Sequence, residues 1–435
     1  MLKQPTVLTR SLPARSPLIR SVALAAAASF ALVACGGDPA TDDVAASSAP
    51  NDGSTEPGSV TERGNATEQG SATPRLALSY DGGVLVLDAA SLKQVADLPV
   101  DGFTRLNSAE NGRNVFVSES GGFRVLDMGT WTRQHGDHGH HYTTAPALTD
   151  MRFGGAEPGH VVPHASRITL FSDGTGEVNI VEPAELLRGN ATSVGYTVPD
   201  PHHGVAVVRG DGSLVTTMGT EDERTTVAIL DKDRKEITRT DQCPGVHGEA
   251  AAADGVLTFG CQNGIVIVRG NEIQKVASPD AAYGRIGNQA GSENSPVVFG
   301  DYKTDKDAEL ERPQRFTLTD TRTGTIRVVD IPTSYSFRSL ERAENGDAVL
   351  LGTDGALYRF NVETGEQISR TPVINAWTEP DQWQSPMPNL HVQGTVAYVS
   401  DPASKSITAV DLATGQQKAK AQLPTETIEL TGVTG

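Results

Sequence analysis

A histidine-rich tract is the part of the chain whose residue types most plainly suggest chemistry. Four of the ten histidines fall within seven consecutive positions, with one aspartate among them: His135, Asp137, His138, His140 and His141. Neutral imidazole is the commonest protein ligand for late first-row divalent ions, and interspersed glycines let a short segment bend around one ion. The alternative is a solvated polar loop, which four histidines in seven positions make the weaker interpretation. The tract predicts a flexible metal-binding loop, with Asp137 as a further ligand or an acceptor that orients an imidazole.

Four more histidines share a different context, because each stands where a short run of small or apolar residues begins: His164, His203, His247 and His391. A single histidine in such a place is more often bonded to backbone carbonyls than to a metal. The same residue type repeated at the same structural position favours a shared metal site instead.

Three neighbouring residues complete the candidate site. His202 is the alternative to His203 as the inward-pointing member of its pair, and His160 is a weaker candidate. Glu249 lies two residues beyond His247 and so on the same face of an expected strand, where it is a candidate carboxylate ligand or an acceptor for an imidazole N–H.

The elements that position these residues are short strands. From Pro74 onward, runs of alternating apolar residues such as 76–80 and 84–88 are separated by turn residues such as 81–83. A period of two indicates β-strands, and about 360 residues of evenly spaced strands exceed one sandwich and favour a β-propeller.

The repeat can be phased by the first strand of each unit, expected near Thr104, His164, His203, His247, Ile286, Phe337 and His391. Residues 425–432 resemble an eighth first strand, and residues 75–99 resemble its missing followers. We therefore predict a closed eight-bladed β-propeller over 74–435, in which the N- and C-terminal strands complete one blade. Seven blades are the alternative if the unit near Ile286 is misphased.

This topology predicts where the histidines lie. In a propeller the first strand of each blade lines the central channel, and the connection into it crosses one face. The four histidines at first strands should therefore surround the mouth of the channel. The tract at 135–141 falls between the units that begin at Thr104 and His164, so we expect it on the same face.

The N-terminal region has the composition of an export signal. Four basic residues and no acidic ones precede an alanine-rich apolar segment, and residues 32–36 resemble the lipobox of bacterial lipoproteins, with Cys35 as the lipidated residue. Residues 1–34 are expected to be a signal peptide, and 35–73, which lack aromatic residues, to be a disordered tether. The protein should be exported and lipid-anchored, at the outer face of the cell membrane or in the periplasm.

The net charge limits the classes of partner, and the cysteine content predicts a disulfide. The net charge is −18, and removal of residues 1–34 makes it −22. Such a chain repels nucleic acid and anionic lipid, so we expect membrane contact only through the lipid anchor and a monomeric protein. Apart from Cys35, only Cys243 and Cys261 remain, and two cysteines in an exported protein are expected to form a disulfide.

These residues resemble the AztD-type periplasmic zinc metallochaperones, which are β-propeller proteins that hand zinc to the solute-binding protein of a zinc ABC transporter. The resemblance rests on residues 137–142, 201–204 and 243–250 together with Cys261. It covers the propeller but not the signal and tether, and an apparent lipid anchor departs from it. It implies that the mouth histidines bind Zn²⁺ tightly and that the tract is a mobile second site or delivery arm. From the residues alone copper and nickel are equally suitable, because imidazole binds all three.

Two other functions compete with a metallochaperone. A histidine-lined channel with one open metal position could belong to a secreted metal-assisted hydrolase or lyase. The chain lacks a Gly-x-Ser-x-Gly motif, and its acidic residues do not cluster with the histidines in sequence, so we expect no enzyme. A plain protein-binding scaffold with incidental histidines is the third interpretation.

Overall fold

The structure is a computed structural model that describes residues 65–280 and 283–435. The expected signal peptide, Cys35 and most of the expected tether lie outside these residues. The end of the expected tether is ordered, because Thr67–Gln69 form strand β1 and pair with β9. The boundary predicted at residue 73 is therefore too late: the free edge of β9 supplies backbone partners that even a polar segment can use.

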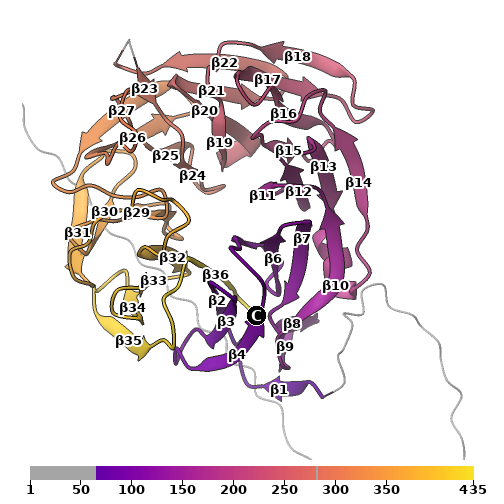
Figure 1. Cartoon of the computed structure of the whole chain (residues 1–435), viewed down its shortest axis with the longest axis vertical. Helices are drawn as coiled ribbons and strands as arrows, with labels where there is room; N and C mark the ends of the chain where they lie inside the picture. Colours follow the sequence, from indigo (N-terminus) through magenta and orange to yellow (C-terminus); the bar gives the residue numbers. More distant parts are fainter. Residues whose placement is uncertain (1–64, 281–282) are drawn as a thin grey trace, which may run out of the picture. The chain divides into compact units, whose positions relative to one another are not determined.

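Antiparallel sheets make up almost all of the described chain. Eight sheets in residues 65–280 and 283–435 have four or five strands each, and they follow one another around a common axis (Figure 1). This is the arrangement of a β-propeller. From the innermost strand outward, the first four sheets are β36 (Glu429–Val433), β2 (Arg75–Tyr80), β3 (Gly83–Asp88), β4 (Gln94–Pro99); β5 (Leu106–Ser108), β6 (Asn114–Glu119), β7 (Gly122–Asp127), β10 (Ala147–Gly154); β11 (Pro158–His164), β12 (Arg167–Ser172), β13 (Glu177–Val181), β14 (Ser193–Thr197); and β15 (Ala206–Val208), β16 (Leu214–Gly219), β17 (Arg224–Leu230), β18 (Glu236–Thr240).

The remaining four sheets follow the same order, and one of them has an extra short strand, β23. They are β19 (His247–Ala252), β20 (Val256–Cys261), β21 (Asn263–Arg269), β22 (Glu272–Ala277) with β23 (Gly284–Arg285) beside β21; β24 (Gln289–Ala290), β25 (Val297–Asp301), β26 (Arg315–Asp320), β27 (Thr325–Asp330); β28 (Leu340–Arg342), β29 (Ala348–Leu351), β30 (Ala356–Phe360), β31 (Gln367–Pro372); and β32 (Asn389–Gln393), β33 (Val396–Asp401), β34 (Ser406–Asp411), β35 (Gln417–Gln422).

The two ends of the described chain share one sheet. Strand β36 pairs with β2 from Arg75 opposite Val433 to Ser79 opposite Glu429. Because β36 is the innermost strand and β2 the next, the C-terminal segment supplies the first strand of the sheet that the N-terminal strands continue. This is the pairing expected for residues 425–432 and 75–99.

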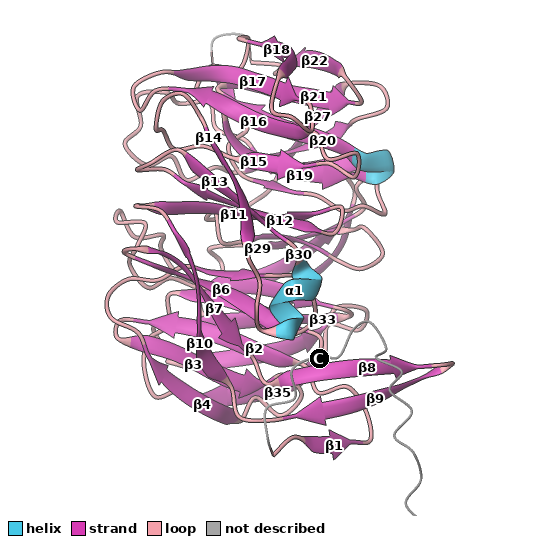
Figure 2. Cartoon of the chain, turned by 90° about the vertical axis from the view of Figure 1, so that its right-hand side faces the viewer, coloured by secondary structure: helices cyan, strands magenta, loops and turns pink. Residues whose placement is uncertain are grey.

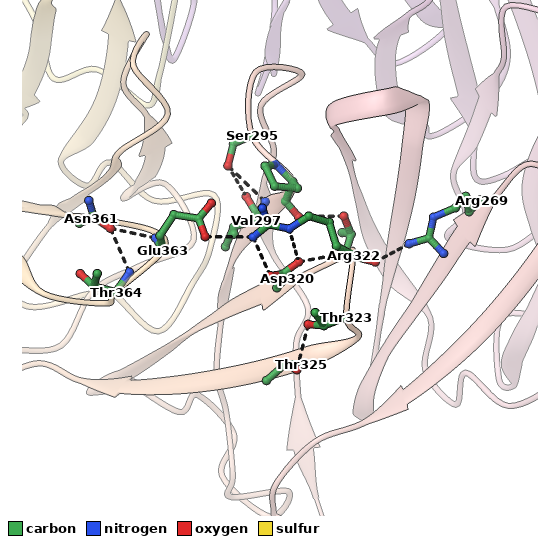
Figure 3. A network of polar contacts seen from close by, with 12 residues as sticks. Arg269, Ser295, Val297, Asp320, Arg322, Thr323, Thr325, Asn361, Glu363 and Thr364 are labelled. Atoms are coloured by element: carbon green, nitrogen blue, oxygen red, sulfur yellow. Dashed lines mark hydrogen bonds and ion pairs between the residues drawn. The ribbon is translucent and has the colours of Figure 1, made fainter.

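The hydrophobic core lies between neighbouring sheets. Val84 and Val86 of β3, for example, pack in one cluster with Val115 and Val117 of β6, and all four are fully buried. Alternation along each strand places such residues on both faces of a sheet, so every sheet packs against two neighbours. Polar contacts add to this packing near the outer edge, where Arg322 bonds Asp320 and Glu363 at 2.7 and 3.0 Å and so links two sheets (Figure 3).

The connections fall on two faces, which we call the mouth face and the far face. Strands alternate in direction within each sheet, so the connections into the innermost strands and those between second and third strands share the mouth face. The connections between first and second and between third and fourth strands share the far face. The short helices α1 (Pro183–Arg188) and η1 (Ala253–Gly255) belong to far-face connections.

The histidine-rich tract lies on the far face, which corrects the prediction that it shares the mouth face. Strands β8 (Thr130–His135) and β9 (His138–Thr143) form a hairpin inserted between β7 and β10, the third and fourth strands of their sheet. Figure 2 shows this hairpin projecting on the same side as α1 and η1. The prediction was wrong because the outermost strand, β10, follows the tract instead of preceding it.

Candidate metal centre

Three histidines from consecutive sheets meet at the mouth face. His160 is in β11, His203 precedes β15, and His247 begins β19; one ligand atom from each lies within 4.8 Å of the other two. Their ring centroids are 5.0 Å apart for His160 and His203, 4.9 Å for His203 and His247, and 5.7 Å for His160 and His247. We call these three residues the mouth triad.

Local backbone irregularities place two members of the triad. The pairing of β11 with β12 shifts register between Pro158 and Val161, and that of β19 with β20 shifts between His247 and Glu249. Such β-bulges re-aim side chains beside functional sites. The second bulge needs glycine: Gly248 has a φ of +67°, and a Cβ there would lie 2.3 Å from the carbonyl oxygen of Gly287.

Each triad ring has its Nδ1 occupied by an acceptor. The Nδ1 of His160 lies 2.8 Å from the Gly204 carbonyl oxygen, that of His247 lies 2.7 Å from the Gly287 carbonyl oxygen, and that of His203 lies 2.5 Å from Asp173 Oδ2. A ring that donates its Nδ1–H to such an acceptor carries its lone pair on Nε2. The contacts therefore leave three Nε2 lone pairs for one ion.

Burial lowers the pKa of two of these imidazoles, those of His160 and His247, and so keeps them neutral. Burial, and then the charge that His203 would carry, lower the pKa of His247 to about 3. Burial lowers the pKa of His160 well below its usual value, and the neighbouring rings of His203 and His247 add to this effect. A site that disfavours protons on its ligands is suited to a metal ion, because only the neutral ring binds one.

The triad lies in a cavity of about 630 Å³ that also contains Glu249. Burial raises the pKa of the Glu249 carboxyl to about 7. The prediction that Glu249 follows His247 on one strand face relied on strict alternation, which the bulge interrupts. Glu249 lines the cavity but is not among the residues whose ligand atoms converge.

A second group of imidazoles lies at the tip of the β8–β9 hairpin. Ligand atoms of His135, His138 and His140 lie within 4.8 Å of one another, and the Nε2 atoms of His138 and His140 are 3.1 Å apart. Carboxylates accept from the outer nitrogens: Asp137 is 3.3 Å from His138 Nδ1, and Glu68 is 2.7 Å from His140 Nδ1. We call His135, His138 and His140 the hairpin triad. Within residues 65–280 and 283–435, the mouth and hairpin triads are the two groups that bring three such ligand atoms together.

The hairpin is a regular element and not the flexible loop that the sequence suggested. Strands β8 and β9 pair from Thr130 opposite Thr143 to His135 opposite His138, with a two-residue turn that begins at Gly136, φ +61°. Alternation then puts His141 on the other side of the hairpin, where its Nδ1 is 2.8 Å from Thr132 Oγ1. His141 is therefore separate from the hairpin triad.

Three other predicted ligands also lie apart from the mouth triad. His202 is buried, with its ring nitrogens bonded to the Asp200 carbonyl and Thr217 Oγ1. His164 is the last residue of β11, next to Glu293 at 3.4 Å, because β11 begins six residues earlier than the sequence predicted. His391 is within β32, 3.5 Å from Glu341.

His160 is the member of the mouth triad that the sequence pattern ranks too low. An innermost strand predicted to begin near His164 leaves His160 outside it, whereas β11 begins at Pro158 and includes His160. One signal could have identified it: each mouth histidine adjoins a glycine, as in Gly159–His160, His203–Gly204 and His247–Gly248. Glycine permits the close backbone approach that this crowded mouth requires.

The expected disulfide is present and supports one triad member. Cys243 and Cys261 are bonded, with Cα atoms 4.9 Å apart, and both are fully buried. The bond joins the segment that leads into β19 to the end of β20. It therefore fixes the backbone just before His247.

Comparisons with known proteins agree with the resemblance inferred from the sequence. No protein-family model matches the chain. A curated protein, the zinc chaperone AztD of Citrobacter koseri, is 24% identical over 367 residues, covering 81% of this chain and 84% of that protein. Its name is that of a chaperone, in agreement with the expectation that the chain is no enzyme.

Solved structures show the same fold. A crystal structure of Citrobacter koseri AztD superimposes with a TM-score of 0.73 and 23% identity, covering 84% of this chain and 99% of that one. The apo form of the same protein gives a TM-score of 0.72 and 22% identity over the same shares of the two chains. The likeness to AztD-type proteins predicted from the sequence is confirmed.

Proposed function

We propose that the chain is a zinc metallochaperone that acts outside the cytoplasm. In this proposal the mouth triad of His160, His203 and His247 holds one Zn²⁺, and the protein passes the ion to the solute-binding protein of a zinc ABC transporter. The observation that carries the proposal is the convergence of three imidazoles whose Nδ1 atoms are already bonded. The similarity to a zinc chaperone over 81% of the chain supports the choice of metal.

The donor set fits both binding and release. Zinc in proteins is usually four-coordinate, and three protein ligands leave one position open. The rigid sheets hold the three ligands, so affinity does not require ordering of a loop. An incoming ligand from another protein can occupy the open position, after which the imidazoles can be displaced one at a time without releasing the free ion.

The hairpin triad is proposed as a second zinc site on the far face. Its ligands are more exposed than those of the mouth triad, and carboxylates of Asp137 and Glu68 accept from two of its rings. Because the hairpin and the mouth lie on opposite faces, the hairpin does not act as an arm over the mouth. We assign it to capture of zinc and the mouth triad to retention.

The rest of the proposed function concerns the whole chain. We propose a closed eight-bladed propeller, supported by the eight sheets and by the pairing of β36 with β2. We also propose that the protein is exported as a monomer and tethered through a lipid on Cys35. None of the helices in residues 65–280 and 283–435 has the length and apolar character that a membrane span needs.

Equilibrium dialysis followed by transfer tests the proposal. The wild-type chain should retain zinc, and a His160→Ala, His203→Ala, His247→Ala variant should retain one ion fewer. A His164→Ala, His391→Ala variant is the matched control and should keep the full content. The zinc-loaded wild type should then load the apo solute-binding protein faster than the same zinc supplied from a small chelator of equal affinity. Unchanged zinc content in the triple variant would refute the mouth site, and equal transfer rates would refute the chaperone role.

A further inference from the structure

The cavity that holds the mouth triad is lined with basic residues, although the chain as a whole is strongly acidic. Arg105, Arg285 and Lys303 line it, in a protein whose net charge is −18. Arg224 is close by, with its Nη1 donating to the His203 carbonyl oxygen at 3.3 Å. Positive charges around a Zn²⁺ site repel the cargo. Their presence requires another explanation.

Three of these four cations, Arg224, Arg285 and Lys303, form no contact ion pair within residues 65–280 and 283–435, although Lys303 interacts electrostatically with Asp301 and Glu379, and Arg285 with Asp301. Arg105 pairs with Glu429 at 3.5 Å, and Glu429 also binds Arg338 at 2.8 Å. Arg285 and Lys303 are in no ion pair there; Arg285 donates to the Gly245 carbonyl oxygen at 3.4 Å.

The two carboxyl groups that line the cavity balance these charges only in part, through the attraction between Asp301 and the side chains of Lys303 and Arg285. Asp301 is buried and accepts from the backbone N–H groups of Gly287 and Asn288 at 2.6 and 3.0 Å. Glu249 is in the inner part of the cavity, since it also lines the next pocket along the channel. Arg285 and Lys303 thus line the mouth, and no hydrogen bond joins either side chain to a carboxylate within residues 65–280 and 283–435.

An aromatic rim adjoins the cations. Trp383 lines the same cavity and is 46% exposed, which is unusual for so large an apolar side chain. The Trp383 and Phe103 rings pack edge-to-face, with their centroids 5.1 Å apart, and the Arg105 guanidinium carbon lies 5.9 Å from the centroid of the Trp383 ring. Exposed tryptophan beside arginine is the composition of protein-binding hot spots.

We propose that the mouth docks a carboxylate-rich segment of the acceptor protein. Arg285 and Lys303 bind its carboxylates, Trp383 packs against its backbone or apolar side chains, and the segment brings a ligand to the open position of the metal. This inference rests on the proposed function, since it identifies the chemistry of the partner at the zinc site. A protein segment fits better than a free small anion because the cavity is many times the volume of such an anion and has an exposed aromatic rim.

The probe for this surface is N-acetyl-hexaglutamate amide, with the hexaglutamine peptide as the neutral match. Binding to the full zinc-loaded chain is measured by isothermal titration at low and moderate salt. Hexaglutamate should bind and hexaglutamine should not, and affinity should fall as salt rises. An Arg285→Gln, Lys303→Gln variant should bind hexaglutamate at least tenfold more weakly. The matched control, Arg188→Gln, Lys232→Gln, removes the same charge from the far face and should bind as the wild type does.

Further arms separate the remaining explanations. An Arg285→Lys variant keeps the charge and should keep most of the affinity for hexaglutamate. This result would show that the weaker binding of the Arg285→Gln, Lys303→Gln variant comes from lost charge and not from misfolding. An equal loss in the mouth and far-face variants, or displacement of the peptide by inorganic phosphate at the same total charge, would overturn the proposal. Zinc content is measured by dialysis on every sample. A wild type without zinc indicates failure of the proposed function, whereas a zinc-loaded wild type that ignores hexaglutamate indicates failure of the docking proposal alone.

Discussion

At the scale of single residues, the acceptor on each Nδ1 decides what the mouth triad can do. Two of the acceptors are backbone carbonyls, which no substitution removes, and the third is the carboxylate of Asp173. A carboxylate on the outer nitrogen fixes the tautomer of the ring and raises the basicity of Nε2. Asp173 is therefore the position where ligand strength can be tested without touching a ligand.

Asp173→Asn should weaken zinc binding by about 10- to 100-fold, the usual effect of losing such a partner. The asparagine keeps an oxygen for the Gly204 N–H, which Asp173 Oδ1 accepts at 3.3 Å, so the local backbone should hold. Competition with a chromophoric chelator measures the affinity, and exposed Asp233→Asn is the control. Wild-type affinity in Asp173→Asn would mean that His203 does not bind the ion.

Stability of the metal-free protein should depend on pH through the buried imidazoles. The folded pKa of His247 is lowered to about 3 by burial and then by the neighbouring His203, from an ordinary 6.5. Between these values the unfolded chain binds a proton that the folded chain refuses, so stability falls as the pH drops below about 6.5. Each such histidine contributes up to about 1.4 kcal/mol per pH unit.

Urea unfolding in the presence of a chelator, at several values between pH 7.5 and 5, measures this slope. His247→Gln should give a shallower decline than the wild type, because glutamine does not titrate. Parallel slopes for the two proteins would contradict the burial of a neutral imidazole at this position.

At the scale of elements, the β8–β9 hairpin shows what a sequence pattern can hide. Residues 138–141 contain three histidines, which we interpreted as a flexible loop because of the glycines. Gly136 instead forms a tight turn, and alternation along β9 selects His138 and His140 for one side and His141 for the other. The period of two was present in the sequence, and the turn that pairs β9 with β8 is local, whereas the pairing of β9 with β1 depends on tertiary contacts.

Replacing His135, His138 and His140 with serine should remove one equivalent of zinc and leave the mouth site intact. Serine keeps the polarity of the exposed tip, so the fold should be unaffected. Equilibrium dialysis measures the zinc content of this variant and of His141→Ser, which is the control within the same hairpin. Full zinc content in the triple variant would show that the hairpin triad does not bind the ion.

The disulfide between Cys243 and Cys261 should stabilise the fold by about 3 kcal/mol, on the chain-entropy model for a loop of this length. The Cys243→Ser, Cys261→Ser variant should unfold at a correspondingly lower urea concentration. It should also bind zinc more weakly, because the bond fixes the approach to His247. Zinc affinity that stays at the wild-type value would separate the disulfide from the metal site.

At the scale of the whole molecule, the sequence predicted the positions of the strands better than it predicted which residues lie on the mouth face. Alternating runs and turn residues placed seven of the eight first strands within four residues of their observed starts, and they predicted the pairing of residues 425–432 with 75–99. The exception is β11, which begins six residues before the predicted position. The β8–β9 hairpin precedes β10, the fourth strand of the sheet before it, and this insertion obscures where that sheet ends in the sequence. That one error moved His164 to the mouth and the tract to the wrong face.

The site was therefore predicted in part. His203 and His247 were placed correctly because each lies at the start of an innermost strand, which turn residues mark in the sequence. His160 depends on a bulge in β11, and the separation of His164 and His391 depends on where β11 and β32 begin. Neither is encoded in local pattern, since both follow from register against a neighbouring strand.

We propose above all that three imidazoles from three consecutive sheets hold one zinc ion at the mouth face. Anomalous diffraction at the zinc edge, from crystals of the chain loaded with one equivalent of zinc, tests it most directly. We predict one strong peak bonded to the Nε2 atoms of His160, His203 and His247, at the distance of about 2.0–2.1 Å usual for zinc and imidazole. A peak at the hairpin triad alone, or one bonded to none of these three residues, would contradict it.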